Sequence, residues 1–480
     1  MVFFQEKASV RLSGLTVTPD ASMIKKSISL LKEASMSAQP LKENKMGTMP
    51  INKLIISMSL PPLTSMFFQF SYNFVDSAFV AQLGEDALTA VSLSFPITTL
   101  MLACSIWVGV GAQVLISRHL GNQDQQAAND TASAGLLFSA LLGVVLNILG
   151  LLIIGPYFRH FTDDETLYEL CMTYMGVCAF MQVPNMVHIQ IQKIIQATGN
   201  MLAPMWFQIA GVVFNFVFDP LLIFGIGPFP EMGIAGAAVS TVGGYTLSMI
   251  LAFFVLFGSE QKVKVRRVFF SHTINKQIMK AGLPSFIMNA LGAFMVLFTN
   301  QFLILCSTTA VAFFGAYFKI QQLIVMTVNG LIQGCLPILS YNYGAKKFDR
   351  LREAFRKGTF IATFLMTISA IALLLFPKPI LSLFAASSEL NAIGIPAMRI
   401  MAFGFTFNAL STMMATCLQS MSRIKDSLLI NLMRQLLVLL PAMFILFKLF
   451  GQTGVWLAFP ICELITFIVA LVLFRRQKFG

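Results

Sequence analysis

Apolar stretches of membrane-spanning length recur along this chain and limit what it can fold into. A helix that crosses a bilayer needs about 20 mostly apolar residues, whereas strands of a membrane barrel are about 10 residues long and alternate in hydrophobicity. The stretches here are long and do not alternate, so we predict an all-α polytopic membrane protein. Twelve spans are predicted, at 54–82, 90–117, 127–155, 166–190, 202–226, 234–258, 277–303, 311–340, 358–385, 389–417, 426–447 and 453–474.

The composition supports a membrane protein and excludes other classes. Charged residues make up 11% of the chain and hydrophobic residues 56%, whereas a soluble domain carries about 25% charged residues. Disordered chains are poor in apolar residues. The 7 cysteines among 480 residues do not suit a small, disulfide-rich secreted module.

The basic residues predict the orientation of the chain. Most of the 33 Lys and Arg residues lie in the two tails and in alternate loops, and only Arg159, Lys378 and Lys448 lie in the opposite loops. The positive-inside rule then places both termini in the cytoplasm, and we expect a multi-pass protein of the plasma (inner) membrane. The net charge of +12 faces anionic lipid in this orientation, so the bilayer is the expected partner and nucleic acid is not.

A shift of 223 residues superposes the two halves of the sequence. Gly111 then meets Gly334, and Gly121 meets Gly344. Such matches are informative because glycine marks a backbone constraint. Each half holds an even number of spans, so we predict two parallel six-helix repeats related by a pseudo-two-fold axis along the membrane normal, an arrangement typical of transporters.

The repeat also sets the expected domain boundaries. Six-helix bundles are predicted at 49–258 and 277–480, joined by a basic cytoplasmic linker at 259–276. Residues 1–48 are polar, of mixed charge and without a signal-peptide core. They are either a disordered cytoplasmic tail or a segment upstream of a true start at Met46 or Met49.

Two acidic residues are the strongest functional candidates, because ionisable groups inside a bilayer are costly. Asp76 and Asp219 lie in the first and fifth spans, and a rise of 1.5 Å per residue places both about 10 Å below the outer surface. Asn215 shares the helix face of Asp219, and Tyr72 and Asn73 lie on a face close to that of Asp76. These oxygen atoms suit Na⁺. They suit a shared proton equally well, because like charges and desolvation favour a protonated carboxyl.

The alternative is that each aspartate only completes a hydrogen-bond network between helices. Under the 223-residue shift, however, Asp76 corresponds to Thr299 and Asp219 to Ala442. The scaffold is duplicated and the carboxylates are not, which favours a functional role.

Other polar residues and prolines complete the candidate site. Gln69, Tyr72, Asn73 and Lys319 are candidates for lining a substrate cavity, and Lys319 could instead neutralise Glu463. Proline at membrane depth frees carbonyl groups and permits bending. The candidate hinges are Pro61, Pro62 and Pro220.

No residue pattern indicates catalysis or ATP use. The chain has no GxxxxGK[ST] phosphate loop, no Ser/His/Asp set and no cluster with metal-ligand spacing. We therefore expect neither an enzyme nor a protein with a cofactor.

Several motifs resemble those of the multidrug and toxic compound extrusion (MATE) family. They are YNFVDSAFVAQLGEDALTAVSLSFPI (72–97), GVGAQVLISRHLGNQD (109–124), FNFVFDPLLIFG (214–225), GIAGAAVSTV (233–242) and PILSYNYGAKKFDRLREAF (337–355). The resemblance covers roughly residues 50–475. It implies a V-shaped pair of six-helix bundles and points to the bacterial branch with acidic residues only in the first bundle.

The resemblance also implies a function and a site. Members export organic cations, drugs or toxic compounds against Na⁺ or H⁺ by alternating access, and we expect this chain to do so as a monomer. The coupling cation, a possible Na⁺, is expected at Asp76, Asn215 and Asp219, and Thr241 matches a threonine that joins the site in some members. A flippase for a lipid-linked precursor is the alternative, and it would need a strongly cationic central cavity, for which Lys319, Arg399 and Arg434 are candidates.

Overall fold

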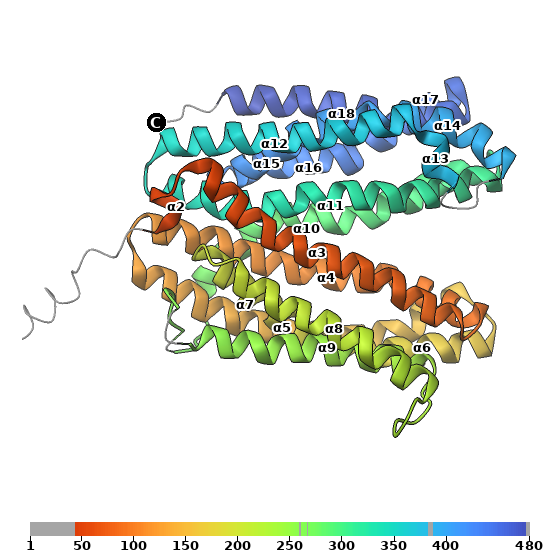
Figure 1. Cartoon of the computed structure of the whole chain (residues 1–480), viewed down its shortest axis with the longest axis horizontal. Coiled ribbons are helices and arrows are strands. Elements are labelled where there is room, and N and C mark those ends of the chain that lie inside the picture. The colour runs from red at the N-terminus through yellow and green to blue at the C-terminus, as the bar shows by residue number, and fades with distance from the viewer. Residues whose placement is uncertain (1–43, 259–260, 266, 383–386, 477–480) are drawn as a thin grey trace, which may run out of the picture. The chain divides into compact units, whose positions relative to one another are not determined.

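A computed structural model describes residues 44–258, 261–265, 267–382 and 387–476 (Figure 1). This part of the chain is helical and contains no strand. Ten helices are long and apolar enough to cross a membrane, and two bent helix pairs bring the number to as many as 12 if each pair is one span. The all-helical architecture and the number of spans agree with the prediction.

The first half, taken as residues 44–258, begins with a short helix and continues through six spans. The loops between consecutive spans are short, so each span runs antiparallel to the one before it. The helices are α2 (Lys45–Thr48), α3 (Ile51–Ala81), α4 (Glu85–Gly121), α5 (Gln125–Phe161), α6 (Glu165–Ala179), α7 (Gln182–Ala197), α8 (Leu202–Phe224) and α9 (Ile234–Leu256).

The second half, taken as residues 267–476, repeats the order of the six spans with two irregularities. A short separate helix, α13, follows the ninth span of the chain, and the eleventh span contains a π-helical turn, η1, between two α-helices. The elements are α10 (His272–Ile304), α11 (Thr308–Gly344), α12 (Phe348–Leu375), α13 (Pro377–Ser382), α14 (Ser388–Ala402), α15 (Gly404–Ser420), α16 (Ile424–Leu432), η1 (Met433–Leu437), α17 (Leu439–Phe450) and α18 (Gln452–Arg475).

Each half contains one bent span, which the apolar pattern alone did not reveal. The fourth span is the pair α6 and α7, bent by 42°, and the tenth is the pair α14 and α15, bent by 40°. The breaks fall at Phe180 and Phe403, which the 223-residue shift superposes. The bend is therefore part of the repeated architecture.

Large apolar side chains cover the outside of the helices. Examples on α5, α9 and α12 are Leu152, Phe254 and Phe360, whose exposed fractions are 68%, 74% and 71%. Exposed apolar surface of this extent marks a membrane or partner surface. Here it lies on membrane-spanning helices and is suited to lipid.

The two halves meet where α4 crosses α11, at glycines that the repeat superposes. Gly121 of α4 lies against the backbone of Tyr341 in α11, and Gly344 of α11 lies against the backbone of Arg118 in α4. A side chain at either glycine would collide with a neighbouring carbonyl oxygen. The glycines thus allow the backbones to touch, as small residues do at interfaces between membrane helices.

The halves also exchange the beginnings of their first spans. Leu54 and Met58 of α3 belong to the apolar core of the second half. Ile278 and Ala281 of α10 belong to the core of the first half. Because both exchanges occur at the end of the molecule predicted to face the cytoplasm, that end is packed closed.

The described fold already includes residues that the sequence assigned to the tail. Asn44 donates from Nδ2 to the carbonyl of Thr198 at 2.9 Å. Met46 is fully buried, and its carbonyl accepts from Asn342 Nδ2 at 3.0 Å. The described chain is thus packed into the fold from Asn44 onward, and residues 1–43 of the predicted 1–48 tail lie outside the described residues.

The crossing of α4 and α11 can be tested with two glycines of one helix. We expect Gly344→Ala to lower the stability by about 1–3 kcal/mol, because the added methyl group overpacks a backbone contact. Gly315, also in α11, has no neighbouring atom in the way of a Cβ. Gly315→Ala should be neutral or slightly stabilising through helix propensity. Thermal unfolding in detergent measures both, and equal melting temperatures for the two variants would contradict the close crossing.

Candidate functional site

Asp76 and Asp219 lie beside each other in the first half. Asp76 is on α3 and Asp219 on α8, and the two carboxyl groups are near enough to interact. The hydroxyl groups of Tyr72 and Ser240 also face Asp219. The structure thus brings together two acids that are 143 positions apart in the sequence.

The defining property of this cluster is a set of buried oxygen atoms that form no hydrogen bond of normal geometry with the described residues. Both carboxylate oxygens of Asp219, Oδ1 of Asp76, Oδ1 of Asn215 and Oγ of Ser240 have no hydrogen-bond partner among the described residues. Asp219 is 1% exposed and Asn215 is 5% exposed. Buried polar atoms are normally paired, so this group of acceptors suits a proton or a small cation.

The local sequence explains how the cluster is built. Asn215 and Asp219 are one helical turn apart on α8, so they present their side chains on one face. Gly244 of α9 leaves the space that Asn215 occupies, since a Cβ at this glycine would meet its amide. The close approach of α8 and α9 therefore depends on a glycine that the sequence analysis did not single out.

Ser240, rather than Thr241, is the α9 hydroxyl that faces Asp219. Thr241 Oγ1 lies 3.3 Å from the Tyr72 hydroxyl and donates to the carbonyl of Ala237 at 3.0 Å. Thr241 thus lies beside the cluster, one hydrogen bond away through Tyr72. Sequence reasoning missed Ser240 because the position of the carboxylates relative to α9 depends on the packing of α8 on α9.

The other predicted residues are placed as follows. Gln69 Nε2 donates to Asn73 Oδ1 at 3.4 Å on the same helix as Asp76. Lys319 is exposed on α11. Glu463 pairs with Arg434, so Lys319 does not neutralise it.

The candidate hinge prolines lie inside helices. Pro61 and Pro62 lie within α3 and Pro220 within α8, and both helices continue through them.

A buried lysine at the junction of the halves was not anticipated. Residues 191–201 were expected to form a loop, but α7 continues to Ala197 and Lys193 is only 5% exposed. Its Nζ donates to Gln196 Oε1 at 3.0 Å and, across the junction, to Gln333 Oε1 of α11 at 2.9 Å. No carboxylate of the described chain forms an ion pair with it. The glutamine-rich run around Lys193 is the sequence signal that could have indicated a buried polar segment.

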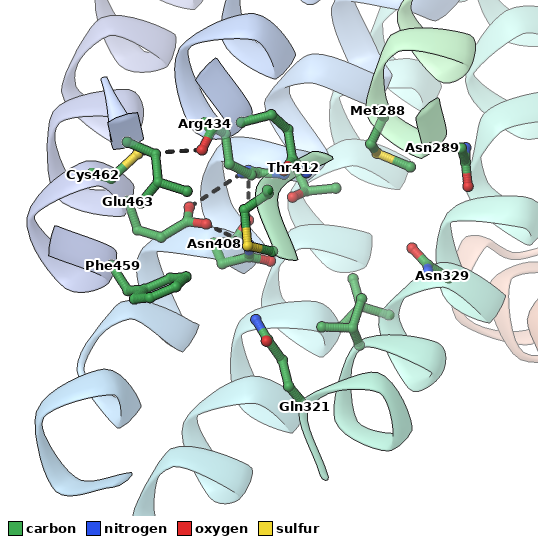
Figure 2. Close-up of a pocket in the computed structure, with 15 residues that line it drawn as sticks. Met288, Asn289, Gln321, Asn329, Asn408, Thr412, Arg434, Phe459, Cys462 and Glu463 are labelled. Atoms are coloured by element: carbon green, nitrogen blue, oxygen red, sulfur yellow. Dashed lines mark hydrogen bonds and ion pairs between the residues drawn. The ribbon is translucent and has the colours of Figure 1, made fainter. Parts of the chain in front are cut away.

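The second half contains a cavity of about 190 Å³ beside an ion pair (Figure 2). Arg434 Nε in η1 lies 3.3 Å from Glu463 Oε2 of α18. Asn408 Nδ2 donates to Glu463 Oε1 at 2.8 Å, and Arg434 Nη2 donates to Ser411 Oγ at 2.5 Å. The guanidinium and the carboxylate thus neutralise each other's charge, and Arg434 joins neither Lys319 nor Arg399 in a cationic cavity.

We expect Lys193 to hold the closed end of the molecule together. Replacing it by methionine removes the hydrogen bond to Gln333 Oε1 between the halves and leaves Gln196 Oε1 with the donor Gln113 Nε2 alone, which is destabilising. Spin labels at Asn122 and Lys346, exposed positions at the ends of α4 and α11, should then report a longer distance. Lys53→Met on the exposed face of α3 is the control, and unchanged distances in Lys193→Met would refute this role.

Comparisons with known proteins agree with this architecture. A model of the MatE family matches residues 61–221 and 284–445. The chain is 28% identical over 433 residues to a FAD transporter of Shewanella oneidensis, which covers 89% of this chain and 95% of that protein. It is 24% identical over 434 residues to the multidrug export protein MepA of Staphylococcus aureus, covering 88% and 93%.

A solved structure of a multidrug resistance MATE family transporter, in an outward-facing conformation, has the same fold. It superposes with a TM-score of 0.84 at 24% identity and covers 90% of this chain and 97% of that chain. The likeness confirms the fold class expected from the sequence.

Proposed function

Because this chain belongs to the MatE family of transporters, we propose that it is a cation-coupled antiporter that exports small organic molecules. Family membership makes it a transporter and not an enzyme. The coupling ion would be Na⁺ or H⁺, entering as substrate leaves. We further propose a location in the plasma membrane with both termini in the cytoplasm, supported by the distribution of Lys and Arg.

The observation that carries the proposal is the set of unpartnered oxygens around Asp76 and Asp219. Two carboxylates, an amide oxygen and a serine hydroxyl form a site rich in acceptors, which favours a hard cation. The same pair could share a proton instead, because two adjacent buried carboxylates resist ionising together. In either case the site binds positive charge in one half of the transporter only.

Alternating access follows if occupation of this site competes with substrate release. Neutralising the carboxylates removes their mutual repulsion and lets α3 repack against α8. Pro61 and Pro62 are the positions of α3 at which bending is least costly. The N-terminal part of α3 lies in the core of the second half. Repacking of α3 would therefore loosen the contacts between the halves at the cytoplasmic end and open the transporter inward.

Two substrate classes are compatible with the chain. The acidic pair and the likeness to MepA favour organic cations and drugs. Export of FAD or related molecules is the second candidate, favoured by the relative in Shewanella and by the amide-rich second-half cavity, whose charged residues neutralise each other. A lipid-linked-precursor flippase is less well supported, because Lys319 and Arg399 do not line that cavity with Arg434.

Removing either carboxylate should abolish coupled export. We expect Asp76→Asn and Asp219→Asn each to lower dye efflux at least about tenfold, which lies in the range of fold-changes that typical coupling energies produce. Expression and melting temperature should stay near wild type. Asp86→Asn, an exposed acid at the start of α4, is the matched control. Wild-type efflux in both single variants would eliminate this site.

The coupling ion can be identified with imposed gradients. In everted vesicles, only one of the two gradients, Na⁺ or pH, applied alone, should drive substrate movement, and Asp219→Asn should lose that response. Ethidium and FAD serve as the two test substrates. Movement that depends on neither gradient would contradict antiport.

A further inference from the structure

The second-half cavity is lined by five membrane spans and has its own polar lining. Its walls come from α10, α11, α15, α18 and the η1–α17 segment. Figure 2 shows Asn289 and Asn329 on one side and the Arg434–Glu463 pair on the other, with Gln321 below the ion pair in this view. Polar groups from separate helices thus converge on one space.

The lining is polar without net charge. Arg434 and Glu463 form an ion pair whose side chains are 9% and 14% exposed, and no other charged residue of the described chain lines the cavity. The remaining polar groups are carboxamides and a hydroxyl. An organic cation would find no uncompensated carboxylate here, so electrostatic attraction does not select for it.

Several of these polar groups have unused hydrogen-bonding capacity. Gln321 Oε1 and Thr412 Oγ1 are buried without a partner. Asn329 and Gln435 make no side-chain hydrogen bond to another described residue, whereas Asn289 Nδ2 donates to the carbonyl of Ser285 at 2.7 Å. Carboxamides both donate and accept, so the cavity can match a ligand edge that carries both kinds of group.

Apolar side chains supply the flat contacts between these polar groups. Phe459, Val325 and the two methionines Met288 and Met295 line the same space. Methionine adapts to ligands of varied shape, and an aromatic ring favours stacking with another ring. Amide edges combined with aromatic and thioether faces are suited to a planar heterocycle.

The backbone at this site is specific to the second half. Arg434 and Gln435 lie in the π-helical turn η1, a distortion that is frequent at functional sites. Under the 223-residue shift Arg434 corresponds to Gly211, which lies within the uninterrupted helix α8. The distortion and the ion pair are thus departures from the repeated scaffold, as are the carboxylates of the first half.

We propose that this cavity is a substrate-recognition site and that its ligand is an uncharged planar heterocycle with hydrogen-bond donors and acceptors along its edge. The inference rests on the proposed transport function. In this proposal the two halves have different functions. The first half binds the coupling cation, and the second half recognises the ring of the exported molecule.

Equilibrium binding to the purified full chain in lipid nanodiscs tests this assignment. Riboflavin, an uncharged heterocycle that carries its own fluorescence, is the first probe, and tetraphenylphosphonium, a cation without hydrogen-bonding groups, is the second. Gln321→Met and Asn329→Leu keep side-chain size while removing hydrogen bonds. Gln322→Met is the matched control, because Gln322 adjoins Gln321 on α11 but is exposed outside the cavity.

We expect the Kd for riboflavin to rise about tenfold or more in each cavity variant, as the loss of one or two hydrogen bonds predicts. The Kd for tetraphenylphosphonium should not change, and Gln322→Met should bind both probes like wild type. Val325→Phe, which narrows the cavity and leaves every polar group in place, should also weaken riboflavin binding. Melting curves identify any variant that fails to fold.

Three results would overturn the proposal. The first is an unchanged riboflavin Kd in all three cavity variants, Gln321→Met, Asn329→Leu and Val325→Phe. The second is equal weakening of riboflavin and tetraphenylphosphonium binding in these variants. The third is the absence of riboflavin binding to the wild-type chain. Failure of the coupling proposal has a different signature, because Asp219→Asn would then retain gradient-driven efflux whatever the cavity variants bind.

Discussion

A charged side chain that leaves water for the interior of a membrane protein must be neutralised by a partner, a proton or a bound ion, or be solvated by polar groups. Arg434 is neutralised by Glu463, and Lys193 is solvated by two glutamine oxygens. Asp76 and Asp219 form no ion pair with a basic residue of the described chain. In the proposed mechanism, a bound cation or a proton supplies their missing positive charge.

The three sites also differ in what disturbs them. The Arg434–Glu463 pair is internal to the second half and is unaffected when the halves move as units. The Lys193–Gln333 bond joins the halves, so any opening at that end breaks it. In the proposed mechanism the carboxylates respond to the concentration of the coupling ion or of protons. A change in solution composition would then act on the first half, and the Lys193–Gln333 bond would transmit it to the second.

The sequence was sufficient for the architecture because its signals are local and strong. Apolar length predicted the spans, and matched glycines such as Gly121 and Gly344 predicted the repeat. Counting residues also predicted one depth for Asp76 and Asp219, but it did not predict that α3 packs against α8 and brings the two side chains together. The structure then added the neighbours of each carboxylate.

What the sequence did not reveal depends on packing between distant segments. Nothing around Phe180 or Phe403 distinguishes a bent span from a straight one by hydrophobicity. Ser240 and Thr241 are adjacent, and only the rotation of α9 against α8 decides which faces Asp219. Lys193 looked like a loop residue because positive charge near a span end usually marks the membrane surface. Its burial depends on Gln333, 140 positions away.

The reciprocal exchange of α3 and α10 has an evolutionary consequence. The start of the first span of each half packs in the core of the other half. Domain swapping produces the same arrangement between two identical chains. A lone six-helix ancestor would have exposed an apolar groove and a complementary helix end, and a second copy would have covered both. A fusion of two such copies would need only a linker between subunits that already share their cores, and each copy could then acquire its own chemistry.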